Sequence, residues 1–292
     1  MGPRSRADAL ILAIVALVGC TSEPTPAPDS TVAPSPTPSA AAAASEEPSR
    51  APDTGGAYLA LGDSITFGIG VSRPQQNGYV ARVADALSGL DATPRIGLSR
   101  VFAVPGETAA GFLDRRLDDV ERAIEAYGPR VELVTIGLGA NEILRARRDD
   151  ACVTDRGGDA CRAAVEAAAT AAASSLGDVV VGVQSALEAA GSDAVVLLLA
   201  YYNPDPDALA VASVAGSDGS VGCDPLEARP GLNDRIACIA EERSVGLVDL
   251  HAAFLGREDE LTRFRAGDVH PNAAGYRVIA DTILEALTDG GG

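Results

Sequence analysis

Two short segments carry side chains that together can perform nucleophilic catalysis. They are Gly62-Asp63-Ser64-Ile65-Thr66 near the front of the chain and Asp268-Val269-His270-Pro271 near its end. A serine hydroxyl attacks effectively when a nearby imidazole takes its proton, and the two residues can be far apart in sequence. The chain has two histidines, His251 and His270, so a serine nucleophile has almost no choice of base.

Ser64 follows an apolar run over residues 58–61, which predicts a buried strand that ends just before the serine. In open α/β sheets, reactive groups gather in the crevice beyond the carboxyl ends of the strands. The alternative is a serine that only caps a helix. Asp63 and Thr66 would then be ordinary turn residues, since Ser and Asp favour such turns.

His270 is followed by Pro271, which suits the first turn of a helix. The positive end of that helix would disfavour an imidazolium and so help to keep the ring neutral as a base. The alternative is a surface or capping histidine. His251 follows Asp249-Leu250 at the end of a predicted strand, and we expect a structural role for it.

Residues 57–289 are long enough to form one domain with a sizeable core. Apolar runs predict five buried strands, at residues 58–61, 98–104, 131–136, 194–200 and 245–250. Helical patterns lie between them, and such alternation implies a parallel sheet with helices on both faces. The sequence contains no internal repeat.

Three helices follow from the spacing of apolar residues. One is ended by Gly128-Pro129 and carries Leu113, Leu117, Val120, Ile124 and Tyr127. A second starts at Pro271 and carries Val278, Ile279, Ile283, Leu284 and Leu287 on one face. An Ala-rich stretch at residues 160–190 predicts a long helix, broken or bent near Gly177 or Gly182. Two longer connections, at residues 138–160 and 202–230, are expected to be loops around the site.

Four blocks occur in order, each after a predicted strand or before a predicted helix. They are residues 62–66, Val104-Pro105-Gly106-Glu107-Thr108, Gly137-Leu138-Gly139-Ala140-Asn141-Glu142 and Asp268-Val269-His270-Pro271-Asn272-Ala273-Ala274-Gly275-Tyr276. Through these blocks the chain resembles the SGNH (GDSL) hydrolase family over nearly all of residues 57–289. The resemblance implies a three-layer, flavodoxin-like α/β fold with a central parallel five-stranded sheet.

The resemblance also implies a role for each block. Ser64 is the nucleophile and His270 the base, while Gly106, Asn141 and the N–H of Ser64 form an oxyanion hole. Acyl transfer needs donors aimed at the oxygen that becomes negative, each contributing about 3 kcal/mol. Gly106 has no Cβ, so its N–H can approach a substrate closely, and Asn141 offers a neutral NH₂ donor. The alternatives are a turn glycine and a loop or capping asparagine.

Two positions depart from the family pattern. The third catalytic member usually lies three residues before the histidine, where this chain has Gly267, and Asp268 is one place closer. We favour Asp268 as the group that orients the imidazole. The alternative is a main-chain carbonyl, which would leave a Ser-His dyad. Glu142 replaces the usual Asp of the third block, and we expect this change to alter loop packing rather than chemistry.

The first 19 residues have the pattern of an export signal. Arg4 and Arg6 precede an apolar stretch at residues 9–18. A short charged start and about ten apolar residues are typical of a secretory signal and too short to span a bilayer. Leu17-Val18-Gly19-Cys20 resembles a bacterial lipobox, which implies cleavage before Cys20 and a lipid on it. The alternative is a plain signal peptide with an incidental cysteine.

Residues 20–56 are mostly Pro, Ser, Thr, Ala and acidic residues. Such a segment has too few large apolar side chains to offset its ordering entropy, so we expect a disordered tether. In extended form it would reach on the order of 100 Å from the lipid. That length suits a domain held off a membrane or through a wall layer.

Four cysteines remain in the body of the chain, Cys152, Cys161, Cys223 and Cys238. An even number in an exported protein indicates disulfides. Three pairings are possible, and we favour the local one, Cys152 with Cys161 and Cys223 with Cys238. A metal site is the other interpretation, but no C-x-x-C or neighbouring histidine supports it.

A net charge of −18 argues against nucleic acid as a partner, because nucleic-acid binding requires a basic footprint.

Taken with the motif blocks and the export signal, the sequence predicts an exported, lipid-anchored ester hydrolase, monomeric and without metal or organic cofactor. Its substrates would be acyl esters such as short-chain esters or lysophospholipids. Two rivals remain open: a carbohydrate O-acetylesterase, and a surface-binding domain that has kept the fold without turnover. The intact serine, glycine, asparagine and histidine argue against the second.

Overall fold

The computed structural model describes residues 55–89, 91–204, 220–224 and 230–289. The expected signal peptide, Cys20 and almost all of the expected tether lie outside these residues. The described residues belong to one compact unit within Arg50–Gly292.

A five-stranded parallel sheet forms the middle layer of this unit. In chain order its strands are β1 (Gly56–Gly62), β2 (Ile96–Ala103), β3 (Val131–Gly137), β4 (Val195–Ala200) and β5 (Gly246–Asp249). Their spatial order is β2-β1-β3-β4-β5. The predicted α/β fold is confirmed, and each of the predicted strands is present close to its expected bounds.

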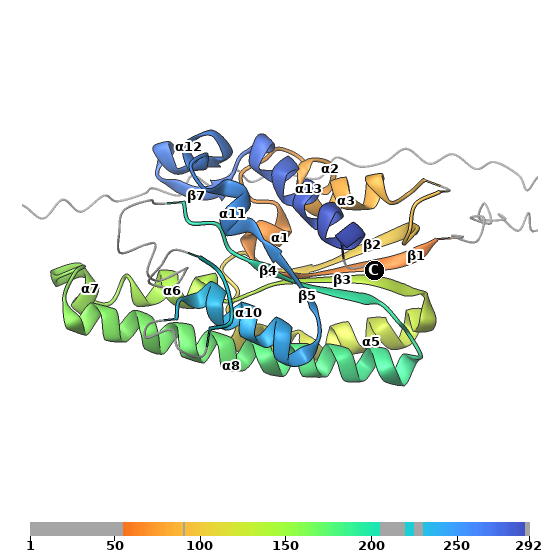
Figure 1. Cartoon of the computed structure of the whole chain (residues 1–292), viewed down its shortest axis with the longest axis horizontal. Coiled ribbons are helices and arrows are strands. Elements are labelled where there is room, and N and C mark those ends of the chain that lie inside the picture. The colour runs from red at the N-terminus through yellow and green to blue at the C-terminus, as the bar shows by residue number, and fades with distance from the viewer. Residues whose placement is uncertain (1–54, 90, 205–219, 225–229, 290–292) are drawn as a thin grey trace, which may run out of the picture. The chain divides into compact units, whose positions relative to one another are not determined.

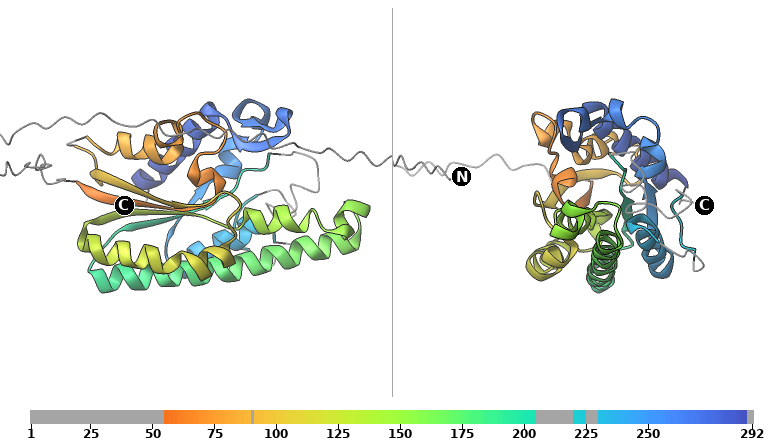
Figure 2. Two further views of the ribbon diagram at one scale, coloured as in Figure 1. Left: turned by 180° about the vertical axis from the view of Figure 1, so that it is seen from behind. Right: turned by 90° about the vertical axis from the view of Figure 1, so that its left-hand side faces the viewer.

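Helices cover both faces of the sheet (Figures 1 and 2). On one face lie α3 (Tyr79–Ala86), α11 (Leu250–Phe254) and α13 (Ala273–Asp289). On the other lie α4 (Ala109–Arg115), α5 (Leu117–Tyr127), α6 (Ala140–Ala146), α8 (Asp159–Ala190) and α10 (Leu232–Arg243). The shorter elements are α1 (Ser64–Phe67), α2 (Pro74–Asn77), η1 (Gly128–Arg130), α7 (Asp150–Thr154), α12 (Glu258–Leu261) and η2 (Phe264–Ala266).

The core has two parts because successive residues of a strand point to opposite faces of the sheet. In β1, Leu59 and Leu61 pack with the layer of α4, α5, α8 and α10. Tyr58 and Ala60 pack with the layer of α3, α11 and α13. All four side chains are fully buried. A strand covered on both faces must be apolar throughout, which is why its sequence is a continuous apolar run.

The chain changes direction across the sheet between β1 and β3. From β1 it continues to β2 on one side, whereas β3, β4 and β5 extend to the other side. Such a switch point leaves a crevice at the carboxyl ends of the two central strands, where α/β proteins bind ligands. The segments that follow β1 and β3 carry Ser64 and Asn141, so the topology brings both residues to this crevice.

The long helix predicted at residues 160–190 is confirmed as α8, which is continuous from Asp159 to Ala190 and is not broken at Gly177 or Gly182. Gly182 instead lies where α8 packs against α5, because a Cβ there would come 2.6 Å from Leu117 Cδ2. α8 is long and apolar enough to span a membrane by length and composition. Its apolar face nevertheless belongs to the core, where Val179 and Val183 are fully buried.

The helix predicted across residues 113–127 is divided into α4 and α5 at Arg116. One of the two expected loops also needs correction, and most of the other lies outside the described residues. Residues 138–160 are largely helical, since they contain α6 and α7. Of residues 202–230, positions 205–219 and 225–229 lie outside the described part of the chain.

A two-stranded antiparallel hairpin, which the sequence did not predict, precedes the last helix. It pairs β6 (Thr262–Arg263) with β7 (Asp268–Pro271). His270 therefore lies in a strand, and the prediction that a helix begins at Pro271 is wrong. α13 begins at Ala273, and Asn272 Oδ1 accepts hydrogen bonds from the N–H groups of Ala274 (2.8 Å) and Gly275 (3.1 Å). The asparagine side chain thus satisfies the free amides of the first turn.

The structure contains two disulfides, Cys152–Cys161 and Cys223–Cys238, which is the local pairing expected from the sequence. The first joins α7 to the beginning of α8, and the second is anchored on α10.

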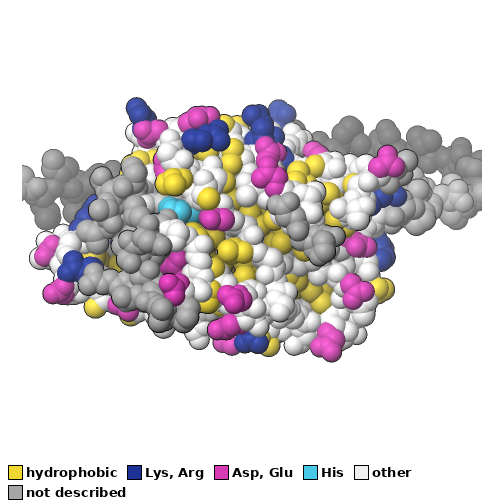
Figure 3. Space-filling model, in the orientation of Figure 1, with side chains coloured by type: hydrophobic (Ala, Val, Ile, Leu, Met, Phe, Trp, Pro, Cys, Tyr) yellow, Lys and Arg dark blue, Asp and Glu magenta, His cyan; other side chains and the backbone are white. Residues whose placement is uncertain are grey.

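On the face of the molecule in Figure 3, acidic side chains are spread widely with arginines among them. This distribution agrees with the net charge of −18.

Candidate active site

Ser64 begins α1 directly after β1, at a turn that leaves little space. The Asp63 side chain caps α1 by accepting a hydrogen bond from the Ile65 N–H at 2.9 Å. A Cβ on Gly62 would lie 2.1 Å from Thr66 Oγ1 and 2.8 Å from the Gly137 carbonyl oxygen. Glycine is therefore required at position 62 for the helix to turn back over the strand and hold the serine at the sheet edge.

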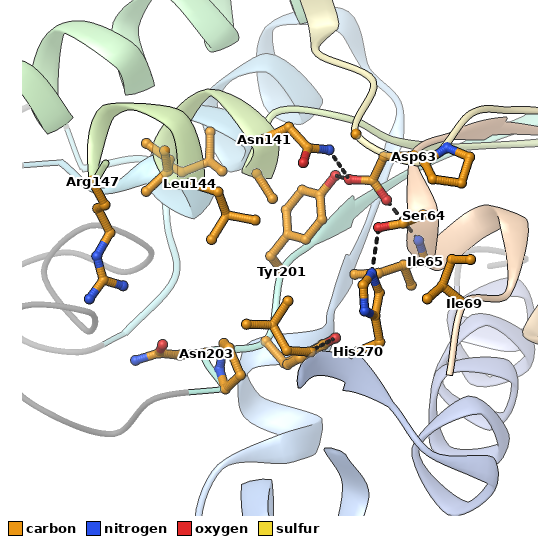
Figure 4. Close-up of a pocket in the computed structure, with 18 of the residues that line it drawn as sticks. Asp63, Ser64, Ile65, Ile69, Asn141, Leu144, Arg147, Tyr201, Asn203 and His270 are labelled. Carbon is orange, nitrogen blue, oxygen red and sulfur yellow. Dashed lines mark hydrogen bonds between the residues drawn. The ribbon is translucent and has the colours of Figure 1, made fainter. Parts of the chain in front are cut away.

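The hydroxyl of Ser64 meets the histidine selected from the sequence. Ser64 Oγ lies 2.8 Å from His270 Nε2 (Figure 4). The other ring nitrogen, Nδ1, lies 2.5 Å from Asp268 Oδ1. The same Asp268 oxygen accepts a hydrogen bond from the His270 backbone N–H at 3.1 Å. A serine, an imidazole and a carboxylate thus form one continuous hydrogen-bonded chain, the arrangement that activates a serine nucleophile.

The hairpin explains how an aspartate only two residues before the histidine reaches the ring. Both residues lie in β7, and residues two apart in a strand point to the same face. Gly267 precedes the strand with φ 76°, a left-handed conformation that glycine adopts easily, and starts β7 at Asp268. Partial burial tends to raise the pKa of Asp268. The hydrogen bonds from His270, its charge and that of Arg263 outweigh this effect and hold the pKa below its ordinary value.

Gly106 and Asn141, the two residues expected in an oxyanion hole, line the same pocket as Ser64 and His270. Gly106 follows β2 with φ 80°, and a Cβ there would meet no atom within 4 Å. Its carbonyl accepts a hydrogen bond from Arg145 Nη2 at 2.8 Å. Asn141 Nδ2 donates to the Glu107 carbonyl at 2.8 Å and contacts Asp63 Oδ2 at 3.3 Å. The asparagine amide is therefore held in place from two sides beside the nucleophile.

Glu142 fixes the helix that carries Asn141. Its Oε1 accepts a hydrogen bond from the Ala109 N–H at 2.7 Å, at the start of α4. Burial raises the pKa of Glu142, with backbone hydrogen bonds opposing the rise. The residue thus joins α6 to α4, which agrees with the expectation that a glutamate in this block acts on packing.

Asp63 is the buried carboxylate of the site, with only 2% of its surface exposed. Its Oδ2 accepts a hydrogen bond from the Tyr201 hydroxyl at 3.0 Å. Burial raises the pKa of Asp63 to about 6, although hydrogen bonds from Ile65 and Tyr201 oppose the rise. Asn233 in turn fixes the backbone of Tyr201, because its side chain bonds both the N–H (2.8 Å) and the carbonyl (2.7 Å) of that residue.

This network was not predicted. Asp63 belongs to the nucleophile block, but nothing in the sequence joins it to Tyr201, which is 138 residues away. Asn233, a buried polar residue on α10, gave no signal at all.

The pocket at these residues has a volume of about 580 Å³. Most of its lining is apolar and includes Ile65, Ile69, Ile143, Leu144, Tyr202 and Leu232. Residues 201–204, which follow β4, also line the pocket, as do Arg147 and Arg148. Figure 4 shows Leu144 and Arg147 on the side of the pocket away from His270.

His251 is buried in α11, in agreement with a structural role. Among the described residues, no three His, Cys, Asp or Glu side chains are grouped so that they could hold a metal ion.

Residues 60–278 match the GDSL-like Lipase/Acylhydrolase family, which covers well over half of the chain. No curated protein resembles the chain closely enough to match it.

Several solved structures share the fold. The lipase Lip_vut3 from a goat rumen metagenome is 22% identical with a TM-score of 0.56, over 79% of this chain and 96% of its own. The acetylxylan esterase Axe2 from Geobacillus stearothermophilus is 21% identical with a TM-score of 0.53, over 80% and 94%. The extracellular lipase from Streptomyces rimosus is 19% identical with a TM-score of 0.51, over 79% and 99%. At these identities the likeness concerns the fold.

Proposed function

The chain belongs to the GDSL-like lipase/acylhydrolase family, and on that premise we propose that Ser64 and His270 hydrolyse acyl esters through an acyl-enzyme. Membership of the family makes the chain a carboxylic ester hydrolase. The substrates that we propose are short-chain esters and lysophospholipids, reached outside the cytoplasm.

In the first half of the proposed reaction, His270 Nε2 takes the proton of the Ser64 hydroxyl while Oγ attacks the ester carbonyl carbon. The carbonyl oxygen becomes negative and is stabilised by the N–H groups of Ser64 and Gly106 and by the Asn141 amide, which gives up its 3.3 Å contact with Asp63 Oδ2 to donate to the oxyanion. The histidine then gives its proton to the alcohol oxygen, which leaves as the C–O bond breaks. Ser64 carries the acyl group at this stage.

In the second half, a water molecule gives a proton to His270 and attacks the acyl carbonyl carbon. The tetrahedral intermediate collapses, the acid leaves, and the proton returns to Ser64 Oγ. Asp268 stabilises the imidazolium that forms in each half and holds the tautomer with Nδ1 protonated. In this proposal Ser64 is the nucleophile, His270 the base, and the N–H groups of Ser64 and Gly106 with the Asn141 amide are the donors for the oxyanion.

One pair of contacts carries this proposal: Ser64 Oγ to His270 Nε2 at 2.8 Å, and His270 Nδ1 to Asp268 Oδ1 at 2.5 Å. The apolar lining of the pocket supports an acyl chain as the group bound next to the ester, because apolar surface favours burial of hydrocarbon. A carbohydrate O-acetylesterase remains the second candidate, since one structure with this fold is an acetylxylan esterase.

We also propose that the protein is exported and held on the outer face of a membrane by a lipid on Cys20. The two disulfides support an extracytoplasmic location, since such bonds persist in oxidising compartments. Cleavage before Cys20 and the tether over residues 20–56 remain predictions from the sequence.

The nucleophile is tested by Ser64→Ala, with Ser88→Ala as a control at an exposed serine. We expect Ser64→Ala to lower kcat on the order of a thousandfold or more, with a thermal midpoint close to that of wild type. A fluorophosphonate should label Ser64 in the wild-type protein and in Ser88→Ala. Full activity of Ser64→Ala, or labelling of another serine, contradicts the proposal.

The substrate class is tested with p-nitrophenyl esters of increasing chain length beside acetylated xylan. We expect kcat/KM to rise from acetate to a medium chain and acetylated xylan to be a poor substrate, because the pocket wall is apolar. A maximum at acetate together with release of acetate from xylan identifies the carbohydrate esterase instead. A correctly folded protein that turns over none of these esters supports the non-catalytic binding domain.

A further inference from the structure

Arg263 lies directly opposite the aspartate of the site in the hairpin of β6 and β7. The two residues are register partners across the antiparallel pair. Cross-strand neighbours of opposite charge attract each other, so the hairpin itself places a guanidinium beside this carboxylate. Neither the family pattern nor the spacing of Asp268 and His270 calls for a cation at this position.

The guanidinium of Arg263 makes two contacts at once. Its Nε lies 3.3 Å from Asp268 Oδ2, the oxygen that does not contact His270. Its Nη1 donates to the Gly70 carbonyl at 3.2 Å. One planar group therefore joins the aspartate of the hairpin to the loop that follows the nucleophile helix. Lysine has a single charged nitrogen and cannot reproduce this fork.

The loop at Gly70 is packed closely against the histidine strand. Gly70 has φ 104°, and a Cβ there would lie 2.3 Å from the Pro271 carbonyl oxygen and 3.2 Å from His270 Cβ. The preceding residue, Ile69, accepts a hydrogen bond from the Tyr276 hydroxyl at 2.7 Å. The spacing between Ser64 and His270 thus depends on how this loop and the hairpin are held together.

We propose that Arg263 is a positioning residue that holds the Asp268 carboxylate on the His270 ring and ties the hairpin to the loop after Ser64. This inference rests on the proposed function and adds to it a residue that contacts no substrate. With Oδ2 engaged by Arg263, Oδ1 stays directed at His270 Nδ1.

The test compares Arg263→Gln and Arg263→Lys with Arg265→Gln, using the full protein and a p-nitrophenyl ester. Arg265 is also in the hairpin region but pairs with Asp259 at the surface, so it is a matched control. Arg263→Gln should lower kcat about threefold to tenfold with KM nearly unchanged, because the ion pair is half-exposed but acts on the geometry of the reacting groups. Arg263→Lys should recover part of this loss, and Arg265→Gln should behave as wild type.

A double-mutant cycle shows whether Arg263 acts through Asp268. In an Asp268→Asn background, Arg263→Gln should lower kcat by a smaller factor than in the wild-type background, leaving only the part that comes from the contact with Gly70. When turnover is too slow to measure, the rate at which a fluorophosphonate labels Ser64 is compared instead across wild type, the two single variants and the double variant. The proposal is overturned if Arg263→Gln has wild-type kcat, if its loss is as large in the Asp268→Asn background, or if Asp268→Asn itself is fully active. Ester turnover by the wild-type protein, and its loss in Ser64→Ala, test the proposed function independently of the role of Arg263.

Discussion

Asp268 reaches His270 because both lie in β7, two residues apart on one face of the strand. If this carboxylate holds the imidazole, Asp268→Asn should lower kcat by well over tenfold, that is by more than about 1.4 kcal/mol. The amide nitrogen would face Nδ1 as a donor and favour the wrong tautomer. Steady-state kinetics of the variant measure the effect, with His270→Ala as the reference for loss of the base.

A main-chain carbonyl is the rival group for orienting the ring. Under that scheme Asp268→Asn would cost less than tenfold in kcat, whereas His270→Ala would still be nearly inactive. A kcat close to wild type in Asp268→Asn would therefore make the site a Ser-His dyad.

Asp63 makes the stability of the protein depend on pH. Its pKa is raised from 3.8 to about 6 in the folded protein, mainly by burial, so folding favours the protonated form. The stability from this group is fully present below pH 3.8 and is lost as pH rises through about 6. The difference between these two pKa values of Asp63 corresponds to about 3 kcal/mol in the free energy of unfolding.

Urea unfolding at several pH values between 4 and 7 measures this contribution. The free energy of unfolding should fall more steeply with pH in wild type than in Asp63→Asn, which has no carboxyl to ionise. Asp85→Asn, at an exposed position on α3, is the control and should follow the wild-type curve. Parallel curves for wild type and Asp63→Asn would show that the buried carboxyl does not titrate in this range.

Residue types in the sequence were enough to select Ser64 and His270, because the chain has two histidines and Ser64 follows a predicted strand. Gly106 and Asn141 were selected through the resemblance of their blocks to the SGNH family. The links from Tyr201 to Asp63 and from Arg263 to Asp268 could not be predicted in the same way. Each joins side chains whose partners are decided by three-dimensional packing.

At the level of elements, continuous apolar runs identified the strands of the parallel sheet because both faces of each central strand are buried. The hairpin of β6 and β7 escaped prediction because Thr262-Arg263 has no apolar alternation to mark a strand. The helix over residues 113–127 was correctly placed, but its division at Arg116 depends on how α4 and α5 pack on α8.

Gly177 and Gly182 lie in the same helix but in different surroundings. A Cβ at Gly177 would meet no atom within 4 Å, whereas at Gly182 it would lie 2.6 Å from Leu117 Cδ2. Gly177→Ala should raise the free energy of unfolding by about 0.5–1 kcal/mol, because alanine is the better helix former. Gly182→Ala should gain less or lose stability, because Leu117 must move. Chemical denaturation of the two variants side by side measures the difference, and equal gains would contradict the close approach of α5 to α8.

For the molecule as a whole, the acidic surface and the disulfides belong to the described domain. The proposed attachment of this domain to a membrane depends on Cys20, which lies outside the described residues. Sequence alone predicted the attachment from the order of a charged start, an apolar stretch and Gly19-Cys20. Packing in the domain cannot test this prediction, because the relevant chemistry is a covalent modification.

Cys20→Ala tests the anchor in a bacterium that exports and lipidates proteins. Stable attachment to a bilayer takes about two acyl chains, so a lipid on Cys20 should place the wild-type protein in the membrane fraction and in the detergent phase of a Triton X-114 partition. Cys20→Ala should lose both properties, because no other described feature ties the domain to a bilayer. The solubilised proteins should have equal kcat/KM, since residue 20 lies far along the chain from Ser64 and His270. Identical fractionation of the two proteins, or a mature N-terminal peptide with unmodified Cys20, would establish a plain signal peptide in place of the lipid anchor.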